Sequence, residues 1–414
     1  MDIEIYKIPT TVDKPELHSF SVPVEINTEQ SSLELEPLHE AILDIREVPN
    51  TEGFYNAAAW EGKREGIDKG KTYLLGRKVE EAGEKGKPDK GSLVLMTLDP
   101  EGNFESSKEV WRARSEEQLL EDARALQLPD GRIVFGLTSV VHKDNDYIPH
   151  PAVLTIKSPE ELSEGLSKLK IVKFLGGVAL GQNYVGQRFT EKFAEERSSA
   201  LEVIDGIVGD QTTPLGEDTG ISPGKNVTAI SPELFAFREE GDKNNHRLRV
   251  FKHQEDGGVV DSQYIDFPKD IPWIEHRIGT TMPPIWLNDN EAIFPIHGIQ
   301  MINDKFVYSI GSARLLRGED GKLSVDNISQ EPIINPDSFV GRFNGDDVEL
   351  HGERRVVYCC GGIPIYNDSG ELEKIKLYIN VGDKRTVEVT TSVAEMTKDW
   401  RKNELIEKAL SLAS

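Results

Sequence analysis

Short apolar runs bounded by Gly, Pro, Asn or Asp recur along the chain, and within many of them apolar and polar residues alternate. Residues 292–296 and 305–310 are an example, with a polar turn at Asn303-Asp304 between the two runs and a Pro283-Pro284 step before them. Alternation with a period of two places every second side chain on the same face of a sheet. The pattern predicts a strand, a turn and a second strand, and it predicts that the first strand ends at His297-Gly298.

Five groups of such runs follow one another along the chain. They are 55–60 with 72–79; 123–128 with 132–139; 226–230 with 234–239 and 248–253; 292–296 with 305–310; and 355–361 with 375–381. Repeated units of short strands joined by turns indicate radial repetition. The sequence therefore predicts an all-β fold, a five-bladed β-propeller.

Helical spacing of apolar residues is scarce and is found over 158–168 and 390–412. In the second stretch Trp400, Leu405 and Ile406 contribute to an apolar stripe, so we expect a helix packed on the outside of the propeller. The expected organisation is edge strands or an arm over 1–50, a catalytic propeller over 51–390 and a C-terminal helix over 391–414. Residues 190–224, rich in Glu, Asp, Gly, Thr and Pro, are expected to form a loop.

The net charge narrows the classes of ligand. The 414 residues include 48 Lys and Arg against 72 Asp and Glu, a formal net charge of -24. Such a charge opposes binding to nucleic acid or to an anionic membrane, so we expect neither partner. A small anion must then be held by a local group of basic side chains.

The cysteine content and the N-terminal sequence indicate the compartment. Cys359 and Cys360 are the 2 cysteines; adjacent residues do not form an ordinary disulfide, and two are too few for a structural zinc site. The chain begins Met-Asp-Ile-Glu-Ile-Tyr, with neither a basic region nor an apolar signal core, so a cytoplasmic location is expected. We find no Walker loop, no Gly-x-Gly-x-x-Gly after a strand and no spacing typical of metal ligands, so no metal is expected.

Polar and charged side chains stand near the ends of the predicted strands, where the central channel of a propeller collects them. They are Asn56 and Arg77 in the first unit, Glu121, Asp122 and Arg124 in the second, Lys225 in the third, His297 in the fourth and Asp383 in the fifth. A Glu-Asp-x-Arg sequence taken alone is typical of an ordinary turn with a salt bridge. The order of the whole set is the specific signal.

That order resembles glycoside hydrolase family 130, the β-mannoside phosphorylases and their hydrolytic relatives. Residues 55–58 (Tyr-Asn-Ala-Ala) and 74–77 (Leu-Leu-Gly-Arg) are similar to the first blade of the family, and 121–124 (Glu-Asp-Ala-Arg) resemble its Glu-Asp-Pro-Arg motif. Residues 279–285 running into 296–298 resemble its Gly-x-Gly-x-Pro-Pro-Ile segment running into Tyr-His-Gly, and 379–383 resemble its Tyr-Gly-Ala-Ala-Asp strand. The related β-1,2-mannan mannosyltransferase-phosphorylases fit the chain as well.

The resemblance implies a five-bladed propeller in which Asp122 is the catalytic acid, acting through a sugar hydroxyl. The implied sugar-binding residues are Asn56, Arg77, Glu121, Arg124 and Asp383, and the implied phosphate-binding residues are Lys225, His297, Arg188 and His150. His150 marks a departure, because phosphorolytic members carry an Arg before the strand that follows it here.

The chemistry of glycoside cleavage makes sense of this set. Inversion needs an acid that protonates the leaving oxygen and a nucleophile on the opposite face of the sugar ring. When inorganic phosphate is the nucleophile, cations must hold it but no base carboxylate is required. We therefore expect phosphorolysis or reverse synthesis of β-mannosides such as β-1,2-mannooligosaccharides, giving mannose 1-phosphate, with phosphate as co-substrate and no cofactor.

Other functions stay open at this point. Within enzymes they are a β-mannoside hydrolase and a nucleotide-sugar-dependent mannosyltransferase. A different class is a non-catalytic propeller that binds sugar or protein partners. The expected partners are a mannose-containing oligosaccharide and phosphate, and a homo-oligomer is left open.

Overall fold

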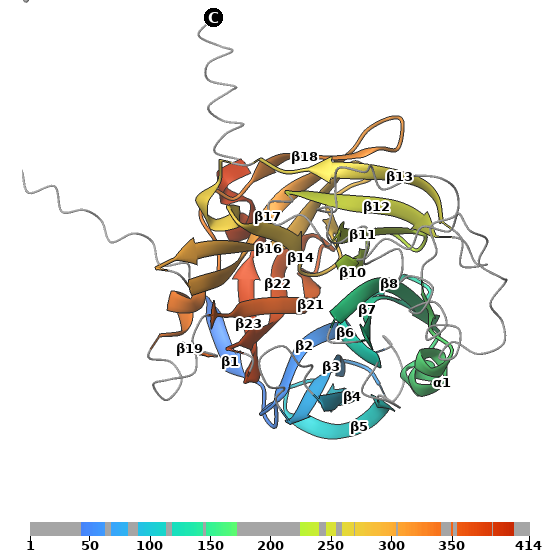
Figure 1. Ribbon diagram of the computed structural model, residues 1–414. Coiled ribbons are helices and arrows are strands. Elements are labelled where there is room, and N and C mark those ends of the chain that lie inside the picture. The colour runs from blue at the N-terminus through green and yellow to red at the C-terminus, as the bar shows by residue number, and fades with distance from the viewer. Residues whose placement is uncertain are drawn as a thin grey trace, which may run out of the picture. The chain divides into compact units, whose positions relative to one another are not determined.

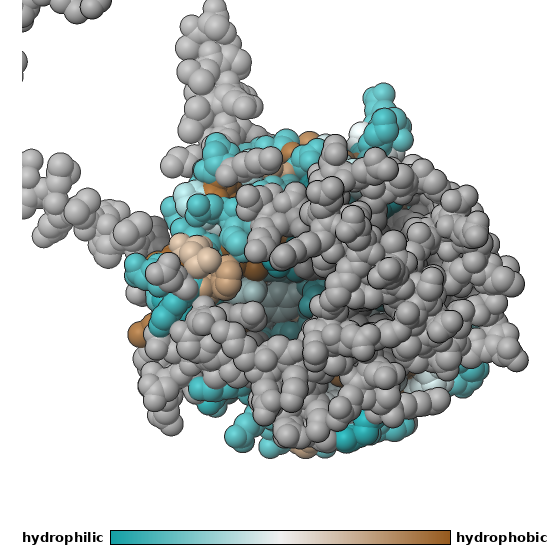
Figure 2. Space-filling view, viewed as in Figure 1, coloured by the Kyte–Doolittle hydropathy of each residue, from teal (hydrophilic) through white to brown (hydrophobic). Residues whose placement is uncertain are grey.

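The computed structural model describes residues 43–62, 68–81, 90–112, 118–143, 146–171, 224–239, 246–253, 259–268, 270–303, 305–340, 349–350, 354–382 and 384–400. Within these ranges the chain forms five β-sheets arranged around a common centre, as Figure 1 shows. The five-bladed β-propeller predicted from the apolar runs is confirmed. On the face shown in Figure 2 most of the coloured residues are hydrophilic.

The blades follow the order of the chain. Blade one comprises β2 (Phe54–Glu61), β3 (Thr72–Glu81), β4 (Lys90–Leu98) and β5 (Phe104–Arg112). Blade two comprises β6 (Gln118–Gln127), β7 (Ile133–Lys143), β8 (Asp146–Ile156) and β9 (Lys170–Ile171). Blade three comprises β10 (Gly224–Ala229), β11 (Leu234–Glu239), β12 (Arg247–His253) and β13 (Val259–Asp266).

Blades four and five are less regular. Blade four comprises β14 (Arg277–Thr280), β15 (Ile285–Trp286), β16 (Glu291–Ile302), β17 (Lys305–Arg317) and β18 (Leu323–Ile328). In the same sheet β20 (Arg354–Arg355) pairs with β17, and β19 (Glu349–Leu350) pairs with β20. Blade five comprises β21 (Val357–Tyr366), β22 (Leu372–Val381), β23 (Arg385–Ser392) and β1 (Asp44–Glu47). The short helices are η1 (Pro159–Glu161), α1 (Leu162–Ser167), η2 (Pro272–Ile274) and η3 (Pro336–Phe339), and residues 393–400 are also helical.

One strand of each blade lies innermost. These strands are β2, β6, β10, β14 and β21, each at the end of its sheet, and β2 contacts both β6 and β21 while β10 contacts β6 and β14. The ring is closed by β1, which pairs antiparallel with β23 so that Asp44 faces Thr390 and Glu47 faces Val387. The beginning and the end of the described chain are thereby joined in one sheet, which satisfies the edge of β23.

Apolar side chains fill the space between neighbouring blades. Between blades one and two, the ring of Trp60 stacks on Tyr73 at 5.6 Å and meets Phe135 edge-on at 5.3 Å. Trp60 and Phe135 are almost completely buried, and burial of a large apolar side chain stabilises a fold by about 1.5–3 kcal/mol. Successive side chains of a strand point to opposite faces of its blade, and each face packs against an adjacent blade. Central strands such as β7 are therefore apolar on both faces.

The predicted helices correspond to helical residues where the structure describes them. Residues 158–168 contain η1 and α1, with Leu162 and Leu166 buried against the core between blades one and two. In the helical residues 393–400, Met396 and Trp400 are buried in the core between blades four and five, so this helix packs on the propeller as expected. Residues 401–414 and 190–223 lie outside the described residues. None of the helices in the described ranges is long and apolar enough to cross a membrane.

The predicted end of one strand is wrong. His297 and Gly298 lie in the middle of β16, which continues to Ile302, and His297 faces Ile310 on β17 and Gly279 on β14. A polar residue and a glycine weaken the local strand signal, but neighbouring strands on both sides continue the hydrogen-bond ladder through them. The imidazole therefore points from the interior of a sheet and not from a turn.

Candidate active site

The innermost strands of the first three blades share an unusual backbone feature. Asn56, Asp122 and Asn226 have positive φ angles of 54°, 52° and 59°, and each lies where the pairing with the next strand shifts register. Asn and Asp tolerate this left-handed conformation better than other residues with a side chain, and an irregularity of this kind re-aims the side chain. Three successive blades thus direct a polar side chain from the same place in the sheet.

Asp122 is held by side chains from other blades. Its Oδ1 accepts a hydrogen bond from Asn56 Nδ2 at 2.8 Å, and the hydroxyl of Tyr358 lies 3.4 Å from its Oδ2. Asn56 in turn accepts from Asn380 Nδ2 at 3.2 Å. Because Asp122 is 9% exposed, the carboxyl group is nearly enclosed by blades one, two and five.

Arg124 is completely buried next to this carboxyl group. Nη1 donates to the backbone oxygen of Asp122 at 2.7 Å, while Nε and Nη2 donate to the backbone oxygens of Thr281 and Thr280, both at 3.1 Å. Nη2 also lies 2.6 Å from the hydroxyl of Tyr358 and 3.2 Å from Oδ1 of Asn226. Burial opposes the charge, but Tyr358, Cys360 and Asp122 outweigh it and hold the pKa of Arg124 above its ordinary value. These contacts tie together four blades, and the predicted contact of Arg124 with sugar stays a prediction.

His297 lies behind Asn226. Its Nδ1 is 3.1 Å from the backbone oxygen of Thr280 and its Nε2 is 3.4 Å from Nδ2 of Asn226. Burial, followed by the charges of Arg238 and Arg124, holds the pKa of His297 well below its ordinary value, so the ring is neutral. A neutral ring that donates from Nδ1 must accept at Nε2. The ring is 1% exposed, and its predicted role as a phosphate ligand stays a prediction.

Gly279 makes this packing feasible. A Cβ atom at that position would lie 2.4 Å from Cε1 of His297 and 2.6 Å from Nδ2 of Asn226. Both distances are too short for real atoms, so any larger residue would displace the ring or the amide. The glycine of the predicted 279–285 motif thus serves the close approach of β14 and β16.

Three charged side chains form a more accessible group beside Asp122. Glu121 lies between Arg77, with Nη1 to Oε1 at 3.5 Å, and Lys225, with Nζ to Oε2 at 3.9 Å. The side chains of Arg77 and Glu121 are each 15% exposed and that of Lys225 is 32% exposed. Arg77 also lies over the ring of Tyr55 at 5.3 Å. The structure therefore brings together Asn56, Arg77, Glu121, Asp122 and Lys225.

Arg238 was missed by the sequence analysis. It lies on β11 directly opposite Lys225, is 7% exposed, and its charge lowers the pKa of His297. A further positive charge therefore lies near the site. The signal in the sequence was a charged residue after Phe235-Ala236-Phe237, and alternation alone does not tell which face of the strand meets the channel. Tyr358, which lies in a predicted strand, was missed for the same reason.

His150, another predicted phosphate ligand, lies elsewhere. His150 is on β8, the third strand of blade two, opposite Ser139, and is 2% exposed. Burial lowers its pKa to about 4, and neither ring nitrogen has a hydrogen-bond partner among the described residues. The structure does not bring it into the group around Asp122, and its phosphate role stays a prediction. Arg188 and Asp383 lie outside the described residues.

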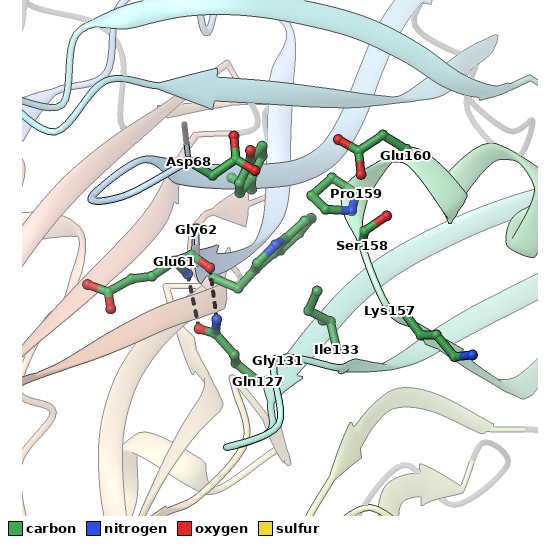
Figure 3. A pocket seen from close by; sticks show the side chains of 12 residues that line it. Glu61, Gly62, Asp68, Gln127, Gly131, Ile133, Lys157, Ser158, Pro159 and Glu160 are labelled. Atoms are coloured by element: carbon green, nitrogen blue, oxygen red, sulfur yellow. Dashed lines mark hydrogen bonds between the residues drawn. The ribbon is translucent and has the colours of Figure 1, made fainter. Parts of the chain in front are cut away.

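A cavity of about 30 Å³ lies between β2 and β6, the inner strands that carry Asn56 and Asp122 (Figure 3). It lies at the ends of these strands that are away from the two residues. Glu61 ends β2 and Gln127 ends β6; Gln127 Nε2 donates to the backbone oxygen of Glu61 at 2.9 Å, and Glu61 N donates to Gln127 Oε1 at 3.2 Å. Five residues of strand separate Asn56 from Glu61, which is about 16 Å. The cavity has room for about two waters and lies in the seam between blades one and two, away from Asp122.

Among the described residues no group of three or more His, Cys, Asp or Glu side chains is arranged to hold a metal ion. Cys359 and Cys360 are both buried as thiols, and burial raises the pKa of Cys359 to about 12. Neither thiol is thereby activated as a nucleophile at neutral pH.

No family model matches this sequence, and no curated protein matches it. Among solved structures, the chain is similar to a β-1,2-mannobiose phosphorylase from Listeria innocua in complex with β-1,2-mannobiose, with a TM-score of 0.52 and 14% identity over 88% of this chain and 95% of that chain. A glycosyl hydrolase from Bacteroides ovatus has a TM-score of 0.49 and 13% identity over 82% and 84% of the chains. A mannose phosphorylase from Leishmania mexicana, in complex with a phosphate ion, has a TM-score of 0.42 and 12% identity over 84% and 86%.

At 14% identity the likeness to the Listeria protein establishes the fold. The chain has the propeller fold of the glycoside hydrolase family 130 proteins, which the order of motifs predicted.

Proposed function

We propose that the protein is a carbohydrate-active enzyme that catalyses inverting phosphorolysis of β-mannosides such as β-1,2-mannooligosaccharides, or the reverse synthesis. The observation that carries the proposal is the nearly enclosed carboxyl group of Asp122, fixed by Asn56 at 2.8 Å, beside the partly exposed cations Arg77 and Lys225. The shared fold of a β-1,2-mannobiose phosphorylase supports the choice of mannoside.

In this proposal Asp122 is the acid. It gives its proton, through a hydroxyl of the bound sugar, to the glycosidic oxygen as the bond between that oxygen and the anomeric carbon breaks. Asn56 donates to Oδ1 and holds the carboxyl group in place. Such positioning raises the rate because the reacting groups need no further search for their geometry.

Phosphate is the nucleophile. One of its oxygens forms the new bond to the anomeric carbon on the face opposite the leaving oxygen, so a β-mannoside gives α-mannose 1-phosphate. Lys225 and Arg77 supply positive charge, with Arg238 behind them; Glu121 offsets one of these charges. Because Lys225 Nζ is 3.9 Å from Glu121, this ion pair is long, and an incoming phosphate competes well for the ammonium group. No cofactor is required beyond phosphate as co-substrate.

The remaining residues of the set have supporting roles. Neutral His297 fixes the amide of Asn226 through the 3.4 Å contact, and Asp383 is assigned to the sugar ring by its place in the motif order alone. Arg188 and His150 are retained as candidates for the phosphate side on the same basis.

Hydrolysis is the second candidate, because Glu121 is a carboxylate directly next to Asp122 in the chain. An inverting hydrolase needs such a carboxylate to activate water. Arg77 Nη1 and Lys225 Nζ lie 3.5 and 3.9 Å from the carboxyl oxygens of Glu121. Phosphorolysis ranks first because these two cations lie on the accessible side of the site.

The test is incubation of the purified full chain with β-1,2-mannobiose, with and without inorganic phosphate. Mannose 1-phosphate that forms only with phosphate supports the proposal. Free mannose without phosphate, carrying oxygen from ¹⁸O-labelled water, indicates hydrolysis, and turnover only with a nucleotide sugar indicates a transferase. Binding of mannooligosaccharide by the wild type with none of these products indicates a non-catalytic propeller.

A further inference from the structure

A chain of hydrogen bonds with a fixed direction runs behind Asp122. Arg124 can only donate, so the hydroxyl oxygen of Tyr358 accepts from Nη2 at 2.6 Å. The Tyr358 proton then points to another acceptor, and Oδ1 of Asn226 lies 2.6 Å away. With Oδ1 accepting, Nδ2 of Asn226 faces Nε2 of His297, and Nδ1 of that ring donates to the backbone oxygen of Thr280. The direction of each hydrogen bond in this series is thereby fixed.

The hydroxyl of Tyr358 has a second acceptor within reach. Oδ2 of Asp122 lies 3.4 Å away, on the carboxyl oxygen that Asn56 does not contact. A small rotation of the O–H bond transfers the donated hydrogen bond from Asn226 to Asp122. Oδ1 of Asn226 keeps a hydrogen-bond donor after this rotation, because Nη2 of Arg124 lies 3.2 Å from it.

The surroundings keep this group a donor. Burial, with Asp122 adding to it, holds the pKa of Tyr358 well above its ordinary value of 10.0 against the opposing charge of Arg124. The phenol ring is packed edge-on to His297, with ring centroids 4.6 Å apart, so its position is fixed. The ring of Tyr358 thus holds the hydroxyl oxygen in place, and the hydroxyl keeps its proton at any pH at which the protein works.

We propose that Tyr358 is a positioning residue that turns its hydroxyl proton to Oδ2 of Asp122 as that group gives up its own proton. The inference rests on the proposed role of Asp122 as the acid and assigns a residue that acts through it. A hydrogen bond to a charged carboxylate is stronger than one to an amide, so the rotation follows the change in charge. The carboxylate formed in the reaction is stabilised, while the neutral acid is left as it was.

The test variant is Tyr358→Phe, which keeps the ring and its packing and removes the hydroxyl. Turnover is expected to fall by about 10- to 100-fold, the scale of one hydrogen bond to a charged group, with KM for β-mannoside and for phosphate within about 3-fold. Above the optimum pH the rate falls because the acid must be protonated. This basic limb should move to higher pH, since the carboxylate has lost a donor.

The matched control is Tyr378→Phe in the same blade. Tyr378 is also buried, with 1% of its surface exposed against 7% for Tyr358, and its hydroxyl donates to Oε2 of Glu388 at 3.1 Å. Tyr378→Phe removes a hydroxyl from a buried site, as Tyr358→Phe does, so it measures the structural cost of that loss alone. Its melting temperature should fall at least as far as that of Tyr358→Phe, while its pH profile stays that of the wild type.

A second measurement separates this inference from the proposed function. In protein labelled with ¹³C-aspartate, the carboxyl signal of Asp122, assigned by its loss in Asp122→Asn, is titrated in both the wild type and Tyr358→Phe. The midpoint should rise by about 1 pH unit in the variant. A change below about 0.3 unit overturns the inference even if phosphorolysis is found. The expected change in a protein with no phosphorolytic activity leaves the inference standing and removes the proposed function.

Discussion

Asn56 on blade one donates from Nδ2 to Oδ1 of Asp122 on blade two across 2.8 Å, and both residues hold positive φ angles to do so. Two strained backbones thus meet in one hydrogen bond at the boundary of two blades. Strain of this kind persists only where the surrounding structure over-determines it, and it is concentrated at functional sites.

Asp122→Asn tests the assignment of the acid. The amide keeps the volume and can still accept from Asn56, but it has no acidic proton, so turnover should fall by roughly 100-fold or more while the fold survives. The measurement is turnover of β-mannoside with phosphate, with the melting temperature recorded beside it. Glu121→Gln is the control, and a phosphorylase should lose much less rate in it. Full activity in Asp122→Asn would remove Asp122 from the mechanism.

Asn56→Ala tests the bond between the two blades. The variant has an alanine in the strained left-handed conformation and also loses the hydrogen bonds with Asp122 and Asn380. The free energy of unfolding should therefore fall by about 2–3 kcal/mol. Asn303, with φ of 50° at an exposed hairpin turn, is the matched control, and Asn303→Ala should cost about 1 kcal/mol with unchanged turnover. Urea titration and kinetics measure both. Equal losses in the two variants would mean that the hydrogen bonds of Asn56 add nothing.

Lys225→Ala tests the phosphate side. Loss of one cation from a partly exposed site should raise KM for phosphate by about 10-fold or more and change KM for β-mannoside much less. Lys252 on β12 of the same blade is the control, because its ion pair with Glu233 at 3.1 Å is exposed and away from Asp122. Equal increases in both KM values would show that Lys225 does not act on phosphate alone.

The buried ring of His150 predicts a pH dependence of stability. Its pKa is about 4 in the folded protein against 6.5 for an ordinary His, so as pH falls below about 6.5 the unfolded chain binds a proton that the folded chain does not. Stability is complete above that pH and decreases as pH falls toward 4, by up to about 3 kcal/mol from this group.

The measurement is urea unfolding at pH 7.5, 5.5 and 4.5 for the wild type and for His150→Leu. The variant cannot titrate there, so the loss of stability between pH 7.5 and 4.5 should be smaller than in the wild type. Identical slopes in the two proteins would show that His150 does not titrate in this range. An increased KM for phosphate in the same variant would support its predicted role in binding the anion.

The local sequence determined two or three strands of each blade and the number of blades. Alternation is a property of a few consecutive residues, so runs such as 72–79 and 132–139 predicted β3 and β7 without knowledge of their neighbours. The order of short motifs also placed Asn56, Glu121, Asp122 and Lys225 in one site, because inner strands of successive blades meet at one channel.

Only the tertiary structure decided which strands close the ring and what lies behind the acid. The pairing of β1 with β23 and the contact of Asn56 with Asn380 join residues hundreds of positions apart. A pattern of period two involves only neighbouring residues in the sequence, so it does not predict such contacts. β14 was missed because four residues are too short for alternation to mark, although it is the inner strand of blade four. Hydrogen bonds between blades give Tyr358, Arg124 and His297 their roles. These bonds depend on which face of each sheet packs against the next sheet, and the sequence alone does not show which face that is.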